Sequence, residues 1–201
     1  MLRMFTDGAV TGNGTPKAVA GSGIIFTYEG RVIRKFNLYL PKKDYPPYQS
    51  NNTGELAGVV FGISQLSKPI SIEVISDSSY VIDTMNLKRY ENWERNGWYT
   101  SNLSRVSNKK YWEELIKYNR LHNVLWTHMK GHQFEREHAG ENLADLDFDI
   151  RMNNIADELA VMAKKNIIVD ECSDDYLDIM NSLEEFTATG DFSDKEGEME
   201  W

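Results

Sequence analysis

Residues 2–40, LRMFTDGAVTGNGTPKAVAGSGIIFTYEGRVIRKFNLYL, decide the class of the fold. Residues 2–7 alternate between apolar and polar side chains, and 19–28 and 31–40 are rich in residues that favour strands. Glu29-Gly30 is a typical tight turn between the last two of these segments. The stretch therefore predicts three antiparallel strands that are joined by hairpins.

After this stretch the apolar residues change from the period of a strand to that of a helix. They occupy one helical face over 55–66, and Pro69 ends that helix. A strand that stops at Asp77, two helices, a strand over 124–129 and a helix ending near Lys165 follow. This order predicts an α/β fold with a mixed five-stranded sheet: three hairpin-linked antiparallel strands, two parallel strands, and helices on the faces.

The composition is that of an ordinary globular chain without signals for export or membrane insertion. No apolar run approaches the length that spans a bilayer, and the first residues lack the apolar core of a signal peptide. We therefore expect a cytoplasmic protein with no membrane partner. Cys172 is the single cysteine, which excludes a disulfide framework and a cysteine-based zinc site.

The formal net charge of −9 is unevenly distributed along the chain. Residues 166–201 contain twelve acids and one base, Lys195, whereas residues 1–165 contain 19 acids and 21 bases. The larger part of the chain is therefore mildly basic, with a net charge of +2, and an acidic tail hides this. We expect one domain over 1–165 and a partly disordered acidic C-terminal tail over 166–201, in which 174–186 suits a short amphipathic helix.

Three acids stand at the ends of predicted elements, where burying a charge is costly unless something compensates it. Asp7 lies late in the first strand, Glu55 opens a helix, and Asp77 ends a strand that should lie beside the first. Magnesium prefers such hard oxygen ligands, and two ions about 4 Å apart can activate a water and stabilise the leaving oxygen of a phosphodiester. No single acid is diagnostic, because an isolated one is more often a turn or cap residue.

Five short strings strengthen the case for these acids. In chain order they are FTDG (5–8), NNTGEL (51–56), SDSSYV (76–81), KGH (130–132) and NNIADELA (153–160). Together they closely resemble the type 1 ribonuclease H family over roughly residues 2–165. The resemblance implies the ribonuclease H-like fold and an endonuclease that hydrolyses the RNA strand of RNA–DNA hybrids, leaving 3′-hydroxyl and 5′-phosphate ends. We expect this enzyme to be a monomer.

The resemblance also implies the residues of the catalytic site. Asp7, Glu55, Asp77 and Asp157 would coordinate two Mg²⁺ ions, for which Mn²⁺ could substitute because both metals suit oxygen ligands. His132 would aid water activation or product release from a mobile loop, since the pKa of a histidine lies near neutrality.

An insertion at about 133–152, relative to many members of that family, leaves an alternative for the last two of these residues. Its segment from His138 to Asp145 imitates the ending of the motif, so these two residues could replace His132 and Asp157. We favour Asp157, because its motif leads directly into the amphipathic last helix. The insertion itself could form a flap over the site.

Candidate substrate contacts occur in two regions. Asn13, Asn51 and Asn52 match family positions whose amides bond the 2′-hydroxyls that distinguish RNA from DNA, and Ser79 stands where many relatives carry a longer amide. The segment 88–110 resembles a basic protrusion that some members use to hold the DNA strand. Its candidate contacts are Lys88, Arg89, Trp93, Arg95, Trp98, Lys109 and Lys110.

Several alternatives stay open from the sequence. A structure-selective DNA nuclease or a non-catalytic hybrid-binding module could use the same fold. The acidic tail could repel nucleic acid, cover the basic surface, bind a protein partner or only aid solubility. We expect structural or surface roles for His122 and His128, and a partly structural role for Trp93 or Trp98.

Overall fold

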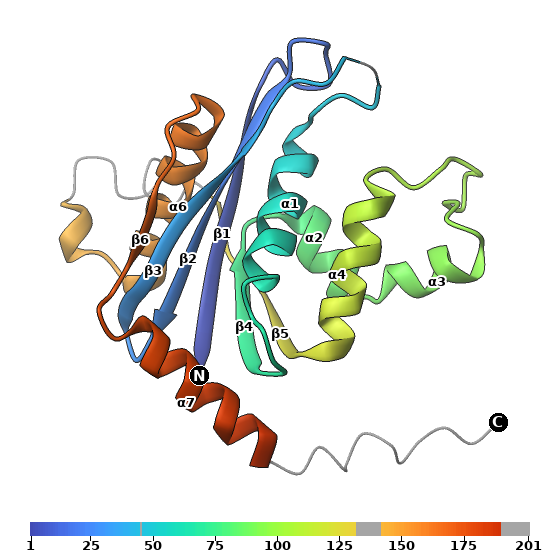
Figure 1. Ribbon diagram of the computed structural model, residues 1–201. Coiled ribbons are helices and arrows are strands. Elements are labelled where there is room, and N and C mark those ends of the chain that lie inside the picture. Colours follow the sequence, from blue (N-terminus) through green and yellow to red (C-terminus); the bar gives the residue numbers. More distant parts are fainter. Residues whose placement is uncertain (45, 132–141, 190–201) are drawn as a thin grey trace.

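The computed structural model describes residues 1–44, 46–131 and 142–189, which form one mixed sheet flanked by helices (Figure 1). Three long strands, β1 (Leu2–Thr11), β2 (Val19–Tyr28) and β3 (Arg31–Leu40), form the antiparallel meander that the sequence predicted. β4 (Ser71–Ser76) pairs in parallel with β1, and β5 (Asn123–His128) pairs in parallel with β4. The α/β class with a mixed sheet is thereby confirmed.

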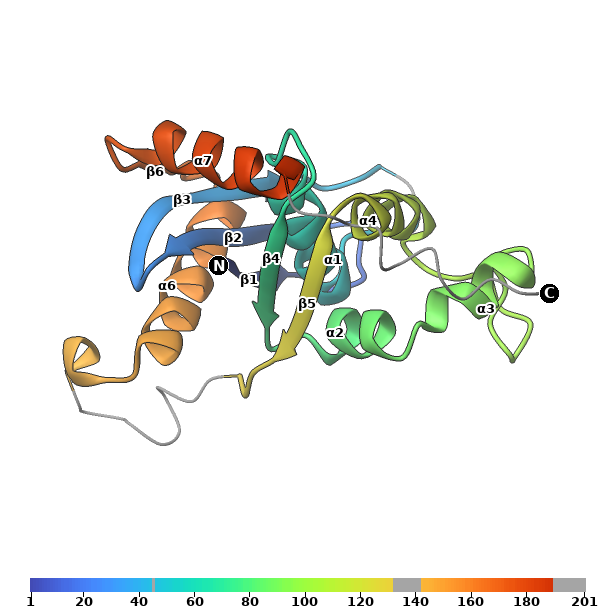
Figure 2. The same cartoon turned by 90° about the horizontal axis from the view of Figure 1, so that it is seen from below.

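Helices cover both faces of the sheet (Figures 1 and 2). α6 packs along β1, β2 and β3 on one face, and α1 packs on β1 and β2 with α4 and α2 beside it. In the described part of the chain, no helix is both long enough and apolar enough to cross a bilayer. The helices of that part are α1 (Asn51–Ile63), α2 (Ser79–Asn86), α3 (Arg89–Arg95), α4 (Lys109–Leu121), α6 (Phe148–Lys164) and α7 (Tyr176–Thr189), with a short 3₁₀ turn η1 (Leu143–Asp145).

The alternation of β1 divides the apolar side chains between two cores. Leu2 and Met4 belong to the larger core, which also holds the fully buried Trp112 of α4. Phe5 points to the other face and packs with Met152 and Leu159 of α6. Full burial of each large apolar side chain contributes about 1.5–3 kcal/mol, so the two cores hold α1 and α6 firmly against opposite faces of β1.

A sixth strand extends the sheet beyond the five strands that the sequence predicted. β6 (Asp170–Cys172) pairs antiparallel with β3, and the sheet order is β5-β4-β1-β2-β3-β6. All three residues of β6 are exposed and two are acidic, so they carry no strand period that sequence analysis could recognise. Ion pairs across the ladder, from Arg34 to Asp170 and from Lys35 to Glu171, help to hold the short strand in place.

The helix expected around 174–186 is present as α7. Ile179 and Met180 are buried in the larger core, and Tyr176 and Leu183 pack against it. The first part of the predicted tail, residues 166–189, therefore packs on the domain through β6 and α7.

Candidate active site

Adjacent parallel strands bring two of the predicted acids to the same level of the sheet. Phe5 of β1 pairs with Ile75 of β4. Two residues further along each chain, Asp7 and Asp77 lie side by side where β4 ends. This arrangement follows the sequence-based expectation that Asp77 ends a strand beside the first.

A close helix–strand contact places Asp157 next to this pair. Gly23 of β2 is the antiparallel register partner of Asp7. A Cβ atom at Gly23 would come within 2.0 Å of the Ala156 carbonyl oxygen, so only glycine lets the backbone of α6 approach so closely. The residue after Ala156 is Asp157, and this approach delivers its carboxylate to the vicinity of Asp7.

Electrostatic coupling shows that four acids share this region. Asp7 is buried, and burial is the main reason why its pKa rises from 3.8 to about 8. Repulsion by the carboxylates of Asp77, Asp157 and Glu55 raises the pKa further, whereas a hydrogen bond from the Gly8 backbone N–H (2.6 Å) lowers it. The acids are close enough to oppose each other's ionisation, as in sites that bind cations.

Glu55 is held in a fixed orientation from the first turns of α1. Its Oε1 accepts a hydrogen bond from Asn51 Nδ2 at 2.6 Å, and its Oε2 accepts one from Ser78 Oγ. Asn13 Oδ1 in turn accepts a hydrogen bond from the Asn51 backbone N–H at 3.2 Å. Burial raises the pKa of Glu55, Ser78 lowers it, and Asp77 raises it.

Ser78 is a positioning residue that sequence analysis did not single out. It is buried, and as the N-cap of α2 it accepts a hydrogen bond from the Val81 N–H while its hydroxyl reaches Glu55. Its place next to Asp77 in the SDSS string is the signal that could have identified it. The link joins the ends of α1 and β4, which carry two of the acids.

The carboxylate of Asp77 lies directly against the backbone of Gly131. A Cβ atom at Gly131 would come within 2.1 Å of Asp77 Oδ2. His128 Nε2 lies 3.2 Å from the Asp77 carbonyl oxygen, which accepts a hydrogen bond from it when that nitrogen carries the proton. His128 therefore supports the backbone of the Asp77 turn, in agreement with the structural role expected for it.

The carboxylate oxygens of the four acids are suitable ligands for a divalent cation, although the side chains are not yet close enough together to coordinate one ion. Within 1–44, 46–131 and 142–189, no three His, Cys, Asp or Glu side chains are grouped closely enough to hold a metal ion as they stand. The four carboxylates nevertheless supply only hard oxygen atoms, and a cation would offset the repulsion that Asp77, Asp157 and Glu55 add to the effect of burial on the pKa of Asp7. The residues thus fit magnesium by their chemistry and by their electrostatics.

Asp145, the alternative to Asp157 that the insertion offers, does not belong to this group of acids. Asp145 is exposed in η1 and is not among the main contributors to the pKa of Asp7, whereas Asp157 is. The last residues of the predicted insertion, from Phe148 on, form the first turn of α6. His132 and His138 lie outside the described residues.

His122 is buried away from the four acids and packs beside Tyr118 at the end of α4. Neither of its ring nitrogens has a hydrogen-bond partner in the described part of the chain, and burial lowers its pKa. A neutral, buried imidazole agrees with the structural role expected from the sequence.

The predicted substrate contacts lie on the surface. Asn13, Asn51, Asn52 and Ser79 are exposed around the start of α1 and α2, although Asn51 is also the hydrogen-bond donor to Glu55. The charged residues predicted in segment 88–110 are likewise exposed, on α3 and at the start of α4; they are Lys88, Arg89, Arg95, Lys109 and Lys110.

The two tryptophans of segment 88–110 are partly buried rather than free. Trp93 packs edge-on against Trp112 with ring centroids 5.4 Å apart, and Trp98 packs against Trp93 at 6.4 Å. Lys109 Nζ lies 5.3 Å from the centre of the Trp98 ring. Both tryptophans therefore anchor the segment to the core, which extends the partly structural role expected for one of them.

Comparison with known proteins shows what the chain as a whole is similar to. The family model described as RNase H matches residues 1–165. The ribonuclease H of Clostridium botulinum (strain Hall) is 35% identical over 155 residues, which cover 77% of this chain and 92% of the relative. Among solved structures, the PFV RNase H domain has a TM-score of 0.64 at 23% identity and covers 82% of this chain and 94% of its own.

A further solved structure, LC11-RNase H1 in complex with RNA/DNA hybrid, has a TM-score of 0.54 at 17% identity and covers 83% of this chain and 98% of its own. Both structural likenesses concern the fold, and the family match covers the five motifs from FTDG to NNIADELA. The chain therefore belongs to the ribonuclease H family.

Proposed function

We propose that this ribonuclease H hydrolyses the RNA strand of RNA–DNA hybrids by a two-metal-ion mechanism and leaves 3′-hydroxyl and 5′-phosphate ends. The observation that carries the proposal is the electrostatic coupling of Asp7 to Asp77, Asp157 and Glu55. Carboxylates gathered at the edge of a sheet, of which Asp7 and Glu55 have pKa values raised by burial and by their acidic neighbours, are costly without a cation. The relatives named ribonuclease H and the hybrid-bound LC11 enzyme support the choice of substrate.

The acids would hold the metal ions, and their neighbours would keep the acids in place. Asp7, Glu55, Asp77 and Asp157 would coordinate two Mg²⁺ ions, with Mn²⁺ as a substitute. Bound there, the ions would supply an activated water and stabilise the leaving 3′-oxygen. Ser78 and Asn51 each donate a hydrogen bond to one carboxylate oxygen of Glu55 and so hold this acid in place.

Substrate choice would come from amides and cations around the acids. Asn13, Asn51 and Asn52 are exposed next to Glu55, where they can bond the 2′-hydroxyls of the RNA strand. The exposed lysines and arginines of segment 88–110 would neutralise phosphates of the DNA strand. His132 would move a proton to or from the reacting water or the product.

A substrate panel tests the proposal. One labelled sequence is offered with Mg²⁺ as RNA–DNA hybrid, duplex DNA and duplex RNA, and the ends of the products are mapped. We expect cleavage of the hybrid alone, in its RNA strand, and loss of this cleavage in Asp7→Asn with hybrid binding kept. Preference for duplex DNA would instead identify a DNA nuclease, and binding without cleavage would identify a hybrid-binding module.

A matched pair of variants tests the fourth ligand. Asp157→Asn removes an acid that contributes to the raised pKa of Asp7, whereas Asp145→Asn removes an exposed acid that does not. We expect the first variant to lose cleavage and the second to retain it. The reverse result would assign the role to the insertion.

A further inference from the structure

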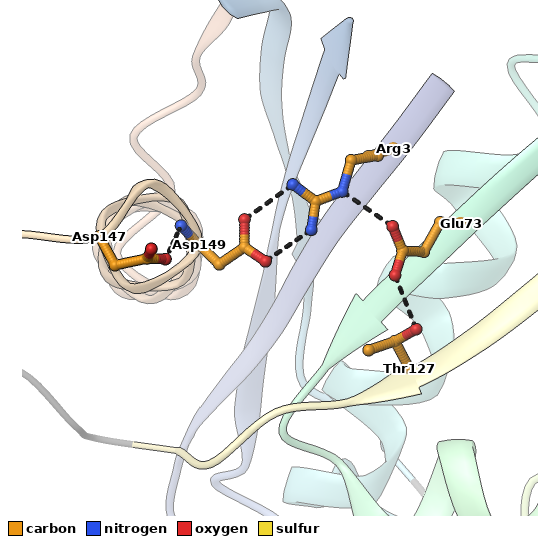
Figure 3. Close-up of polar contacts among 5 residues, drawn as sticks. All are labelled: Arg3, Glu73, Thr127, Asp147 and Asp149. Atoms are coloured by element: carbon orange, nitrogen blue, oxygen red, sulfur yellow. Dashed lines mark hydrogen bonds and ion pairs between the residues drawn. The ribbon is translucent and has the colours of Figure 1, made fainter. Parts of the chain in front are cut away.

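A network of polar side chains on the α6 face of the sheet ties the start of α6 to β1 and β4 (Figure 3). Arg3 of β1 donates from Nη1 and Nη2 to the two carboxylate oxygens of Asp149, at 2.7 and 2.5 Å, and from Nε to Glu73 of β4 at 2.8 Å. Thr127 of β5 donates to the other oxygen of Glu73 at 2.8 Å. A bidentate arginine–carboxylate pair is strong and fixes geometry as well as distance.

The network is partly shielded from solvent. The exposed fractions are 27% for the Arg3 side chain, 15% for Glu73 and 39% for Asp149. Asp149 itself is fixed in the first turn of α6, because its backbone N–H donates to Oδ1 of the N-cap Asp147 at 2.9 Å. Arg3 therefore holds a rigid part of the helix, and Glu73 braces Arg3 from the opposite side.

The spacing along the two elements connects this pair to the catalytic site. Arg3 and Asp7 are four residues apart on β1, about 13 Å at the rise of a strand. Asp149 and Asp157 are eight residues apart on α6, about 12 Å at the rise of a helix. α6 runs in the same direction as β1, since Ala156 meets Gly23, the partner of Asp7, and Ala160 meets Gly21, the partner of Ala9.

The rest of the contact between α6 and the sheet is mainly apolar, with Phe5 packed on Met152 and Leu159, and one hydrogen bond from Asn37 Nδ2 of β3 to the Leu159 carbonyl oxygen (3.1 Å) holds the middle of the helix. The Ala156 and Ala160 carbonyl oxygens lie against Gly23 and Gly21, the two positions of β2 that carry no side chain. Apolar contact is non-directional, and a shift by one residue would move the helix by about 1.5 Å along its axis. The ion pair at the start of α6 is directional and opposes such a shift.

We propose that the Arg3–Asp149 pair, braced by Glu73, holds the first turn of α6 in register with β1 and thereby helps to set the position of Asp157 along β1, beside Asp7. Arg3 and Asp149 are positioning residues that act through Asp157. This inference rests on the proposed metal-dependent function, because it assigns Asp157 to the magnesium site.

Variants of the pair test this register, with a similar ion pair as the control. Arg3→Gln and Asp149→Asn each break the bidentate contact. Arg31→Gln breaks another bidentate pair, between the start of β3 and Asp175 just before α7, two elements that carry none of the four acids. The measurements are magnesium affinity by calorimetry without nucleic acid, kcat and KM on a hybrid, and Tm.

We expect Arg3→Gln and Asp149→Asn to weaken magnesium binding about 10-fold and to lower kcat by a similar factor, while KM for the hybrid changes less than about 2-fold. The double variant should be no worse than Arg3→Gln alone, because Arg3→Gln already removes the contact with Asp149 together with the contact with Glu73. Arg31→Gln should keep magnesium affinity and kcat even where it lowers Tm.

Other results would overturn the inference. If Arg3→Gln lowers Tm but leaves magnesium affinity and kcat unchanged, the pair is only structural. If Arg31→Gln loses as much magnesium affinity and kcat as Arg3→Gln, the effect is general loosening of the fold. If the wild-type chain binds no magnesium at millimolar concentration, the proposed function fails first and the inference falls with it.

Discussion

At the scale of single residues, the position of Asp77 depends on the absence of a side chain at residue 131. A methyl group there would come within 2.1 Å of Asp77 Oδ2, so the carboxylate must turn away. We expect Gly131→Ala to lower hybrid cleavage about 10-fold or more, as displaced supporting groups of metal ligands do. The change in Tm should be small, because the group that yields is the end of a side chain.

The control for this variant is Gly30→Ala in the turn between β2 and β3. Gly30 has a φ of +74° and open space around its Cβ position, so alanine there strains the backbone without touching the acids. It should cost about 1 kcal/mol of stability and leave cleavage unchanged. If Gly131→Ala cleaves the hybrid as fast as the wild type does, the Asp77 carboxylate does not pack closely against residue 131.

A second prediction at this scale concerns the pH dependence of stability. In the folded chain the pKa of Asp7 is raised to about 8, whereas in the unfolded chain it is about 3.9. Between these values the folded state holds a proton that the unfolded state releases, so stability falls as pH rises from about 4 to 8. The asparagine of the Asp7→Asn variant cannot ionise, so this variant does not lose stability for this reason as the pH rises.

Thermal melts without metal test whether the ionisation of Asp7 lowers the stability of the fold as the pH rises. At pH 8 Asp7→Asn should melt above wild type by roughly 2–4 °C, equivalent to about 1 kcal/mol, and the difference should shrink toward pH 5. Magnesium should raise the Tm of wild type and not that of the variant, because only a state that binds the ion is stabilised by it. A variant that is less stable than wild type at pH 8 without metal contradicts the burial of Asp7 among acids.

At the scale of elements, the sequence predicted the long strands and the main helices because their apolar periods are regular. It could also predict that Asp7 and Asp77 meet, since parallel neighbouring strands bring their ends together. It could not predict β6, whose exposed acidic residues gain their order from pairing with β3. Nor could it reveal the link from Ser78 to Glu55, because this is a contact between separate elements. The link from Asn51 to Glu55 lies within α1, where the spacing of four residues is a signal that sequence analysis could have used.

α7 offers a prediction at the same scale. Ile179 is 9% exposed and belongs to the larger core, whereas Leu177 on the same helix is 70% exposed. Ile179→Ala should cost about 2 kcal/mol of unfolding free energy, whereas Leu177→Ala should change it by less than about 0.5 kcal/mol. Denaturant unfolding measures both values. Equal effects would mean that α7 does not pack on the domain in solution.

At the scale of the whole molecule, the distribution of charge bears on how a chain with a net charge of −9 binds a polyanion. The part over 1–165 has a net charge of +2, and its cations on α3 and α4 are exposed. Of the acidic residues after position 165, those of β6 and the residue before α7 already face Arg34, Lys35 and Arg31. Their charge is therefore partly neutralised by ion pairs on the surface of the domain.

The last twelve residues, 190–201, carry a further net charge of −4 that these ion pairs do not use. This charge repels phosphates, and at low salt such repulsion acts over roughly 10 Å or more. Removal of 190–201 should therefore strengthen hybrid binding several-fold at about 50 mM salt, and the gain should vanish near 1 M salt. Binding curves over a salt series measure this effect.

A second variant keeps residues 190–201 and separates the effect of charge from that of length. Its five tail acids are replaced by the corresponding amides, and it should bind the hybrid as tightly as the truncated chain does. These acids are Asp191, Asp194, Glu196, Glu198 and Glu200. Unchanged affinity at low salt in both variants would show that the tail does not oppose substrate, and a gain that persists at 1 M salt would exclude an electrostatic cause.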